Sequence, residues 1–309
     1  MTDRLLIFPY HHPSDLEIIT DLLPRCRDKK SISDPPTVVE IKGLLEIPVI
    51  QKRTRIWTTH EGLPVGYLLV DKANNLVFDF LKGFLNSILE DQLIRMATEF
   101  VQENLQILEE SYLEMTVREE DEKRIAMLMR SGFHPQAATT LTYGISLKHI
   151  TPESEPPVGY KIRQFKGEAE MQELISLHQA AFKSTKMSVE ERTAFMNSPI
   201  YDPVLDIVVV SPDDKLVGYA ICTIDKLSNH LSGQLNGSID FIAVHPDHQR
   251  KGLGTCLVNR CLNLISLYGM EQVYLDASSE NTAMEKTALK TGFQLTGKRL
   301  QYSKKIHKQ

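Results

Sequence analysis

Two short motifs recur along the chain as pairs in the same order and at similar spacing. The tripeptide Val-Gly-Tyr stands at 65–67 and again at 217–219, an offset of 152 residues. The dipeptide Gly-Phe ends a helix-like segment at Gly132 and again at Gly292, an offset of 160 residues. Matches at a nearly constant offset indicate that one fold occurs twice, with a chance coincidence of short motifs as the alternative.

The length and the position of the prolines agree with this duplication. A chain of 309 residues corresponds to about two domains of ordinary size. The segment Thr151–Pro157 contains three prolines and two acids, so it cannot continue a helix or a central strand. We therefore expect domains at 1–150 and 157–309, with a long surface loop inside one domain as the alternative. Helix-like and strand-like runs alternate in both halves, which predicts an α/β (α+β) fold class.

Composition excludes several classes of function. Residues 1–150 carry 17 basic and 22 acidic side chains and residues 151–309 carry 18 of each, so neither half is a basic nucleic-acid-binding domain. No stretch approaches the roughly 20 apolar residues that span a bilayer, and the N-terminus lacks the pattern of a secretory signal. The four cysteines form no Cys-x-x-Cys pair. We expect reduced thiols in a cytoplasmic protein, with a nucleophile or a metal site as the lesser alternative.

The clearest chemical signal lies in the segment 239–255. A strand-like run ends at Val244, and the sequence Gln-Arg-Lys-Gly-Leu-Gly at 249–254 opens a helix. The first N–H groups of a helix lack internal partners and point outward at the positive end of its dipole. Gly252 and Gly254 would let a phosphate approach the backbone, and the two residues before them are basic. The spacing predicts a phosphate or pyrophosphate site, unless the glycines serve only close packing of the helix on a strand.

The run Gln249-x-x-Gly252-x-Gly254 after a strand resembles the pyrophosphate-binding motif of the GNAT family, the acetyl-coenzyme A-dependent N-acetyltransferases. The segment from Asn281 to Phe293 resembles that family's following motif. The resemblance implies two tandem GNAT-like domains, each with a mixed, mostly antiparallel sheet flanked by helices. This layout is similar to that of mycothiol synthase, which pairs one active domain with one degenerate domain.

The resemblance also implies how acetyl-CoA, the co-substrate, binds and reacts. The backbone at Ile242 and Val244 would pair with the pantetheine arm, and an N–H near Val244 would stabilise the oxyanion. The acceptor, an amine-bearing small molecule or peptide, would attack the thioester directly, without an acyl-enzyme and without a metal. The residues that the resemblance implies for coenzyme binding are Ile242, Ala243, Val244, Gln249, Arg250, Lys251, Gly252, Leu253, Gly254, Thr255 and Asn281.

The acid and the base are less determined. Many family members carry a tyrosine acid seven residues after the motif asparagine, where this chain has Ala288. Tyr219 or Tyr302 could replace it from neighbouring strands, with packing as the alternative role of each. Asp240 lies, by strand alternation, on the same face as Val244 and is the favoured base, acting directly or through water. A solvated residue at a sheet edge is the alternative reading of Asp240.

The first copy lacks the features of the second. No Gln/Arg-x-x-Gly-x-Gly run precedes its helix near Leu89. Asp121 stands where the second copy has Asn281, and an acid facing a phosphate is unfavourable. We therefore predict that residues 1–150 form a degenerate, noncatalytic copy.

The function predicted for residues 157–309 is acetyl-CoA-dependent N-acetyl transfer. The acceptor region is expected to include 181–202, where Ser188 and Glu191 have the spacing of a helix capping box. The alternative is a noncatalytic acyl-CoA-binding sensor or interaction module. We expect a monomer or a homodimer with no nucleic-acid or membrane partner.

Overall fold

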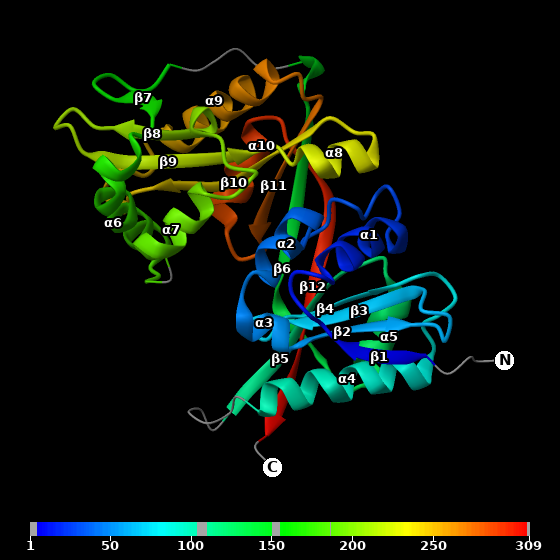
Figure 1. Ribbon diagram of the computed structural model, residues 1–309. Helices are drawn as coiled ribbons and strands as arrows, with labels where there is room; N and C mark the ends of the chain where they lie inside the picture. Colours follow the sequence, from blue (N-terminus) through cyan, green and yellow to red (C-terminus); the bar gives the residue numbers. More distant parts are fainter. Residues whose placement is uncertain (1–4, 104–109, 150–154, 186, 308–309) are drawn as a thin grey trace. The chain divides into compact units, whose positions relative to one another are not determined.

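The computed structural model describes residues 5–103, 110–149, 155–185 and 187–307, and it divides into two compact units (Figure 1). Unit 1 comprises Met1–Thr140, His230–Gly233 and Lys298–Gln309. Unit 2 comprises Leu141–Asn229 and Gln234–Gly297. Part of the proline-rich segment expected to act as a linker, 151–154, lies outside the described residues.

The units do not coincide with the expected domains 1–150 and 157–309, because two long strands contribute to both. β6 (His134–Ser146) begins in unit 1 and ends in unit 2, and β12 (Gln294–His307) begins in unit 2 and ends in unit 1. Within unit 1, β12 pairs antiparallel with β5 (Glu110–Arg118) from Arg299 to His307. The last strand of each copy therefore ends in the other unit, and β5, β6 and β12 belong to an eight-stranded sheet that is separate from the four-stranded sheet of unit 1. Motif offsets locate where a copy begins, but they carry no information about which sheet the end of a strand joins.

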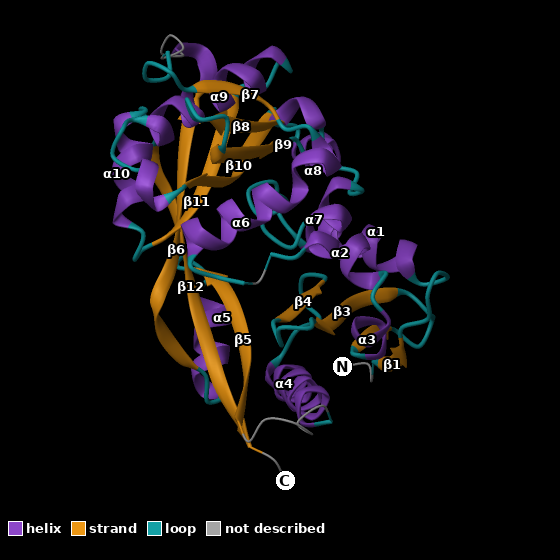
Figure 2. Cartoon of the chain, turned by 90° about the vertical axis from the view of Figure 1, so that its left-hand side faces the viewer, coloured by secondary structure: helices purple, strands orange, loops and turns teal. Residues whose placement is uncertain are grey.

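Unit 1 is built on a four-stranded antiparallel sheet in the order β1-β2-β3-β4, of which β1, β3 and β4 are labelled in Figure 2. One hydrophobic cluster joins this sheet to the helix α4, to β5 and to the last part of β12, and it includes the buried Trp57 and Tyr302. The remaining elements of unit 1 are β1 (Leu6–Pro9), α1 (Leu16–Cys26), α2 (Val38–Leu45), α3 (Pro48–Lys52), β2 (Thr54–Thr58), β3 (Pro64–Val70), β4 (Leu76–Phe80), α4 (Ser87–Gln102) and α5 (Glu122–Arg130).

Unit 2 follows the order β6-β11-β10-β9-β8-β7 in the second sheet, in which β10 and β11 run parallel and β7 to β10 pair antiparallel. Its helices cover both faces: α9 packs with one set of side chains of β9 and β10, and α6 packs with the alternate set. The elements are β7 (Lys161–Gln164), α6 (Met171–Phe182), α7 (Val189–Met196), β8 (Asp206–Val210), β9 (Leu216–Thr223), α8 (Lys226–Ser232), β10 (Asn236–Val244), α9 (Leu253–Leu267), β11 (Gln272–Ser278) and α10 (Thr282–Lys290).

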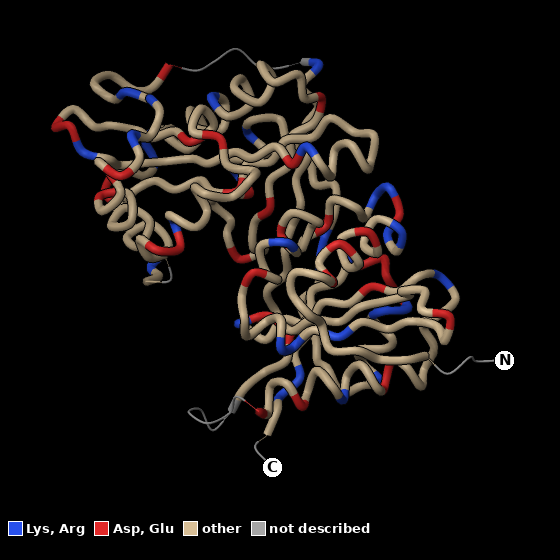
Figure 3. Tube along the Cα trace, viewed as in Figure 1, with Lys and Arg blue, Asp and Glu red and all other residues tan. Residues whose placement is uncertain are grey.

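These sheets confirm the predicted fold class, a mixed α/β architecture with mostly antiparallel strands flanked by helices. The capping box predicted at Ser188 is confirmed, because its side chain accepts from the Glu191 N–H while the Glu191 carboxylate accepts from the Ser188 N–H. Basic and acidic residues are interspersed along the trace of each unit (Figure 3).

The four cysteines are free thiols, and three of them are buried. Burial and the nearby Asp79 raise the pKa of Cys26 to about 12, so this thiol is not an activated nucleophile. Within the described ranges, no group of three or more His, Cys, Asp or Glu side chains could hold a metal ion. No helix in the described part of the chain is long and apolar enough to cross a membrane.

Candidate functional site

Two parallel strands of unit 2 separate partway along their length. The pairing of β10 with β11 runs from Asn236–Gln272 to Ile239–Leu275. β10 then continues to Val244 while remaining paired with β9, and the register shifts at Asp240. The backbone of β10 beyond this bulge therefore has one edge paired with β9 and another edge that lies past the described pairing with β11.

The direction of the backbone groups follows from one hydrogen bond at the end of β10. The His245 N–H donates to the Val217 carbonyl at 2.8 Å, so it points toward β9. Because successive residues of a strand point their N–H and C=O groups to opposite edges, those of Ile242 and Val244 point toward the gap between β10 and β11. Gln249 crosses to this edge, since its Nε2 donates to the Val244 carbonyl at 3.1 Å.

Residues 245–252 connect this strand to the helix α9, which leaves its first turn open. Gly252 is the N-cap residue with a left-handed backbone (φ +84°), and no side chain caps the helix among the described residues. A Cβ added to Gly252 would meet no described atom within 4 Å. The N–H groups of Leu253, Gly254 and Thr255 therefore face an accessible space, which is the arrangement that binds phosphate groups.

Two cations precede this helix start. Arg250 is exposed and adopts a left-handed backbone (φ +60°), and Lys251 is exposed beside it. In the described part of the chain, no carboxylate forms an ion pair with either side chain. Both charges are available to an anion, and each adds to the attraction of the helix dipole.

The structure assigns Asn281 a local role. Its Oδ1 accepts a hydrogen bond from the Met284 N–H at 3.0 Å and caps the first turn of α10. The oxygen is therefore committed to the helix, and a contact with a coenzyme would use the amide nitrogen or the backbone. Asn281 and the start of α9 both belong to unit 2.

The bulge changes where Asp240 points, so the expected face is wrong. Ile239 and Ile242 pack on the α9 side of the sheet, whereas Phe241 packs on the α6 side. The spacing of three between Ile239 and Ile242 shows that simple alternation fails at the bulge. The exposed Asp240 carboxylate accepts a hydrogen bond from the Thr223 hydroxyl at 2.7 Å. Thr223 lies two residues from Ile221, which packs on the α6 side, so Asp240 faces α6 and not the face of Val244.

Neither tyrosine proposed as an acid is placed to touch a substrate in this arrangement. Tyr219 is fully buried, and its hydroxyl lies 2.6 Å from Nδ1 of the buried His178. Burial raises the pKa of Tyr219. Tyr302 belongs to the hydrophobic core of unit 1, because the end of β12 pairs with β5. Tyr302 is therefore wrong as a catalytic residue of the second copy, and Ala288 is fully buried where family members carry an acid.

The structure adds a buried ion pair that sequence reasoning missed. Arg192 of α7 and Asp206 of β8 are both almost fully buried, and the guanidinium Nη2 donates to the carboxylate. Tyr201 donates its hydroxyl to the same carboxylate at 2.8 Å. This pair anchors the segment 181–202, the expected acceptor region, to the sheet. No sequence signal marks Arg192, since its helix shows an ordinary mixture of polar and apolar residues.

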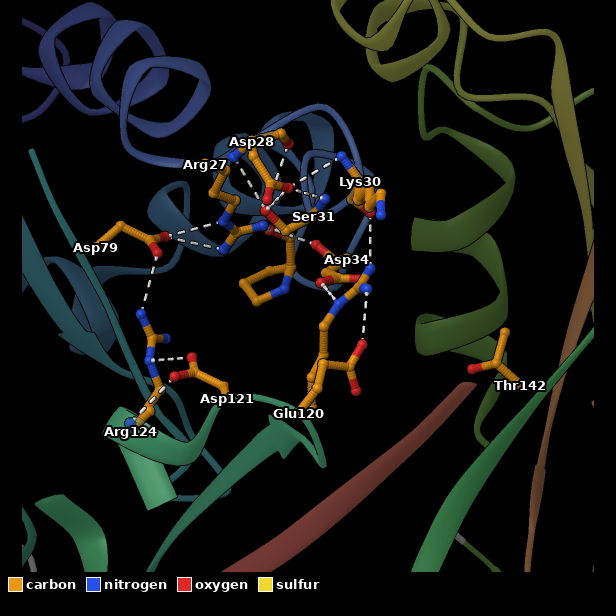
Figure 4. Close-up of polar contacts among 12 residues, drawn as sticks. Arg27, Asp28, Lys30, Ser31, Asp34, Asp79, Glu120, Asp121, Arg124 and Thr142 are labelled. Carbon is orange, nitrogen blue, oxygen red and sulfur yellow. Dashed lines mark hydrogen bonds and ion pairs between the residues drawn. The ribbon is translucent and has the colours of Figure 1, made fainter. Parts of the chain in front are cut away.

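The position in unit 1 that matches Ala243 of β10 is Asp79, and polar side chains surround it (Figure 4). Asp79 of β4 accepts two hydrogen bonds from Arg27, at 3.1 and 2.9 Å, and one from the hydroxyl of Tyr67 at 2.8 Å. Arg124 adds an ion pair at 3.7 Å, and Arg27 also donates to two carbonyls of the 34–36 segment. Four polar side chains thus close the middle of unit 1.

Residues 171–293 match the model of the acetyltransferase (GNAT) family. A GCN5-related N-acetyltransferase from Sphaerobacter thermophilus is similar in structure, with a TM-score of 0.77 and 18% identity over 99% of this chain and 96% of that chain. A tandem GNAT protein from the clavulanic acid biosynthesis pathway is also similar, with a TM-score of 0.73 and 15% identity over 99% of this chain and 100% of that chain. N-myristoyltransferase of Saccharomyces cerevisiae is similar with a TM-score of 0.66 and 13% identity over 100% of this chain and 80% of that chain. None of the curated proteins matches the chain.

Proposed function

We propose that unit 2, whose residues 171–293 match the acetyltransferase (GNAT) family, transfers an acetyl group from acetyl-CoA to an amine. One observation carries the proposal: the edge of β10 beyond its pairing with β11 is followed, after residues 245–252, by the uncapped start of α9. An extended arm can pair with the strand edge while a pyrophosphate sits on the helix N–H groups.

The residues present fit such a co-substrate. Ile242 and Val244 offer backbone groups toward the gap between the strands. Leu253, Gly254 and Thr255 offer helix N–H groups, and Gly252 leaves the space beside them open. The bound co-substrate supplies the activated thioester, and these backbone groups bind and orient it.

The reaction follows from the groups near the strand end. A neutral amine attacks the thioester carbonyl, and the Val244 N–H donates to the oxygen on which negative charge develops. We assign Asp240 as the base, because it is exposed on the side of α6 and α7, the expected acceptor side. The amine nitrogen forms a bond to carbon, its proton passes to Asp240 directly or through water, and the carbon–sulfur bond breaks. A thiol with a pKa near 8.5 leaves as a thiolate and takes a proton from solvent, so no tyrosine acid is required.

A titration with acetyl-CoA by calorimetry tests the binding half of the proposal. Gly252→Asp places a carboxylate in the phosphate space and should abolish binding, whereas Gly252→Asn is nearly isosteric and uncharged. Both side chains tolerate a left-handed backbone about equally, so the pair isolates the charge. Equal binding by both variants, or no binding by the native chain, contradicts the proposal.

Release of coenzyme A thiol in the presence of amines tests the chemical half. A panel of small amines and lysine-bearing peptides should include acceptors that give steady turnover, and Asp240→Asn should lower the turnover number by about 100-fold or more with little change in coenzyme affinity. The proposed site of action is the cytoplasm, where reduced thiols persist.

A second candidate function is a noncatalytic acyl-CoA sensor. It is favoured by the buried Ala288 and by the engagement of Tyr219 with His178, because neither position offers a side-chain acid to the leaving thiolate. Tight binding of acetyl-CoA without thiol release for any amine in the panel would support it over the enzyme.

A further inference from the structure

Three side chains of unit 2 meet on one oxygen beside the start of α9. The hydroxyl of Tyr160, just before β7, lies 3.0 Å from Nδ1 of His248. Lys251 donates from Nζ to the same hydroxyl oxygen at 3.1 Å. The ring of His248 meets the Tyr160 ring edge-on at 5.9 Å, and the Lys251 ammonium lies 5.7 Å from the centroid of that ring. We call Tyr160, His248 and Lys251 the hydroxyl cluster.

The hydroxyl cluster is electropositive. Partial burial, Lys251 and His245 lower the pKa of His248, while Asp213 and Asp247 oppose the shift. Asp247 is exposed and faces His245 at 3.7 Å, and Asp213 is exposed and pairs with Lys215. No carboxylate in the described residues pairs with Lys251 itself. A bound anion at this point would stabilise the protonated imidazole of His248.

The hydrogen-bond capacity of the tyrosine points to what the cluster receives. A hydroxyl oxygen has two lone pairs and one hydrogen. When His248 is protonated, its Nδ1–H and the Lys251 ammonium occupy both lone pairs of Tyr160. The Tyr160 O–H, the two remaining hydrogens of Lys251 and the second nitrogen of His248 are then left to donate. Several donors that converge with two positive charges match a phosphate dianion.

We propose that the hydroxyl cluster binds the 3′-phosphate of the coenzyme A ribose, next to the pyrophosphate on α9. This rests on the proposed function, because the cluster is continuous with the Arg250–Gly252 segment of that site. A phosphomonoester is close to a dianion at pH 7. The cluster therefore makes the protein selective for coenzyme A over the form that lacks the 3′-phosphate.

The test compares acetyl-CoA with 3′-dephospho-acetyl-CoA by calorimetry. The native chain should bind acetyl-CoA about tenfold more tightly, the scale of one charge-assisted hydrogen bond. Tyr160→Phe and His248→Asn should each reduce this preference while leaving the affinity for the dephospho form nearly unchanged. Lys251→Met also removes a cation beside the pyrophosphate site, so it should weaken the binding of both forms as well as reduce the preference. Lys290→Met, at the far end of α10 from Asn281, is the matched control and should keep the preference.

Proton exchange supplies a second readout. Binding of the dianion should draw a proton onto His248 at pH 7, which calorimetry in buffers of different ionisation enthalpy measures. His248→Asn should remove that uptake, and it should be absent with the dephospho form. Equal affinity of the native chain for both ligands overturns the assignment and leaves the proposed function standing. Failure to bind either ligand overturns the proposed function and the assignment together.

Discussion

The last helices of the two copies, α5 and α10, are almost the same structure. The N-cap residues Asp121 (φ −84°, ψ 67°) and Asn281 (φ −87°, ψ 69°) each accept a hydrogen bond from the N–H three residues on. Each helix has nine residues and is followed by a left-handed glycine, Gly132 or Gly292. An acid and an amide satisfy this cap equally well. The exchange of one for the other therefore keeps the fold and changes only the charge offered to a ligand.

The middle strands of the copies differ in one decisive pair. Tyr67 pairs with Asp79 across β3 and β4, and Tyr219 pairs with Ala243 across β9 and β10. The acid in unit 1 draws in Arg27 and receives the hydroxyl of Tyr67. The alanine in unit 2 leaves Tyr219 to bond His178 on the α6 side instead. A single side chain on the strand thus decides whether the interior of the copy is filled by ions.

The helices that follow these strands differ in the same sense. Asn86 caps α4 by accepting from the Leu89 N–H at 3.1 Å, whereas α9 starts at Gly252 without a side-chain cap. In unit 1, the ring of Phe80 packs so closely against Gly66 of the paired strand that a Cβ on Gly66 would collide with it. On similar backbones, a few side chains at matched positions therefore decide whether the helix start is capped, as in unit 1, or open to the proposed coenzyme, as in unit 2.

Removal of the exchanged strand end should break the comparison most severely. A chain that ends at Gly297 loses the part of β12 that pairs with β5, together with the buried Tyr302 and Ile306. We expect unit 1 to unfold while α9 stays protected from hydrogen exchange. Trp57, the single tryptophan, is fully buried in the same cluster, so its fluorescence reports the loss. Removal of residues 308–309 alone is the control, and a blue-shifted Trp57 in the shorter chain contradicts the expectation.

The next largest effect is expected at Asp79. Asp79→Ala leaves the buried Arg27 and the Tyr67 hydroxyl without their shared partner, which typically costs about 3–5 kcal/mol of unfolding free energy. Urea unfolding followed by Trp57 fluorescence measures the loss. Asp34→Ala removes a partly exposed pair with Arg118 and should cost only about 1 kcal/mol. Similar losses in both variants would show that Asp79 is not the closing residue of unit 1.

The features that sequence predicted are those encoded locally. The capping box at Ser188, the start of α9 and the GNAT resemblance each depend on residues within a few positions of one another, and the structure or the family match confirms them. The repeated motifs likewise fix the order of the elements, because both copies use the same chain order of strand and helix.

The features that sequence missed depend on distant partners. Alternation predicts the wrong face for Asp240, because a bulge adds a residue that no pattern of apolar positions reveals. Tyr302 lies in the hydrophobic core of unit 1, because the end of β12 pairs there with β5. The Arg192–Asp206 pair joins a helix to a strand, and the sequence around each residue does not predict that the two form an ion pair.

A smaller difference between the copies should appear with pH. Burial and Arg192 lower the pKa of His178 in the folded state. Below about pH 6.5 the unfolded chain therefore binds a proton that the folded chain does not, so unit 2 loses stability as the pH falls. The slope should stay below about 1.4 kcal/mol per pH unit for one histidine. Hydrogen exchange of the α9 amides at about pH 7.5 and about pH 5.5, on either side of the ordinary histidine pKa, would measure this slope.

The matched position in unit 1 supplies the contrast for this measurement. Cys26 stands 152 residues before His178, and its pKa of about 12 keeps it neutral over this range. His178→Gln should flatten the pH dependence of unit 2 at the expense of some stability at pH 7.5. An unchanged slope in that variant would assign the effect to other groups.

The smallest effect concerns the caps of α4 and α9. Asn86→Ala removes the acceptor of the Leu89 N–H and should lower the unfolding free energy of unit 1 by about 1 kcal/mol, measured by Trp57 fluorescence in urea. Ser87→Ala, one position further on, changes no capping bond and is the control.

The Asn86→Ala variant should still bind a single equivalent of acetyl-CoA, because a helix start needs more than free N–H groups to bind the coenzyme. The ring of Phe80 covers Gly66 in unit 1, whereas a Cβ on Gly252 in unit 2 would meet no described atom within 4 Å. A second equivalent bound by Asn86→Ala would show that the cap alone separates the closed copy from the open one.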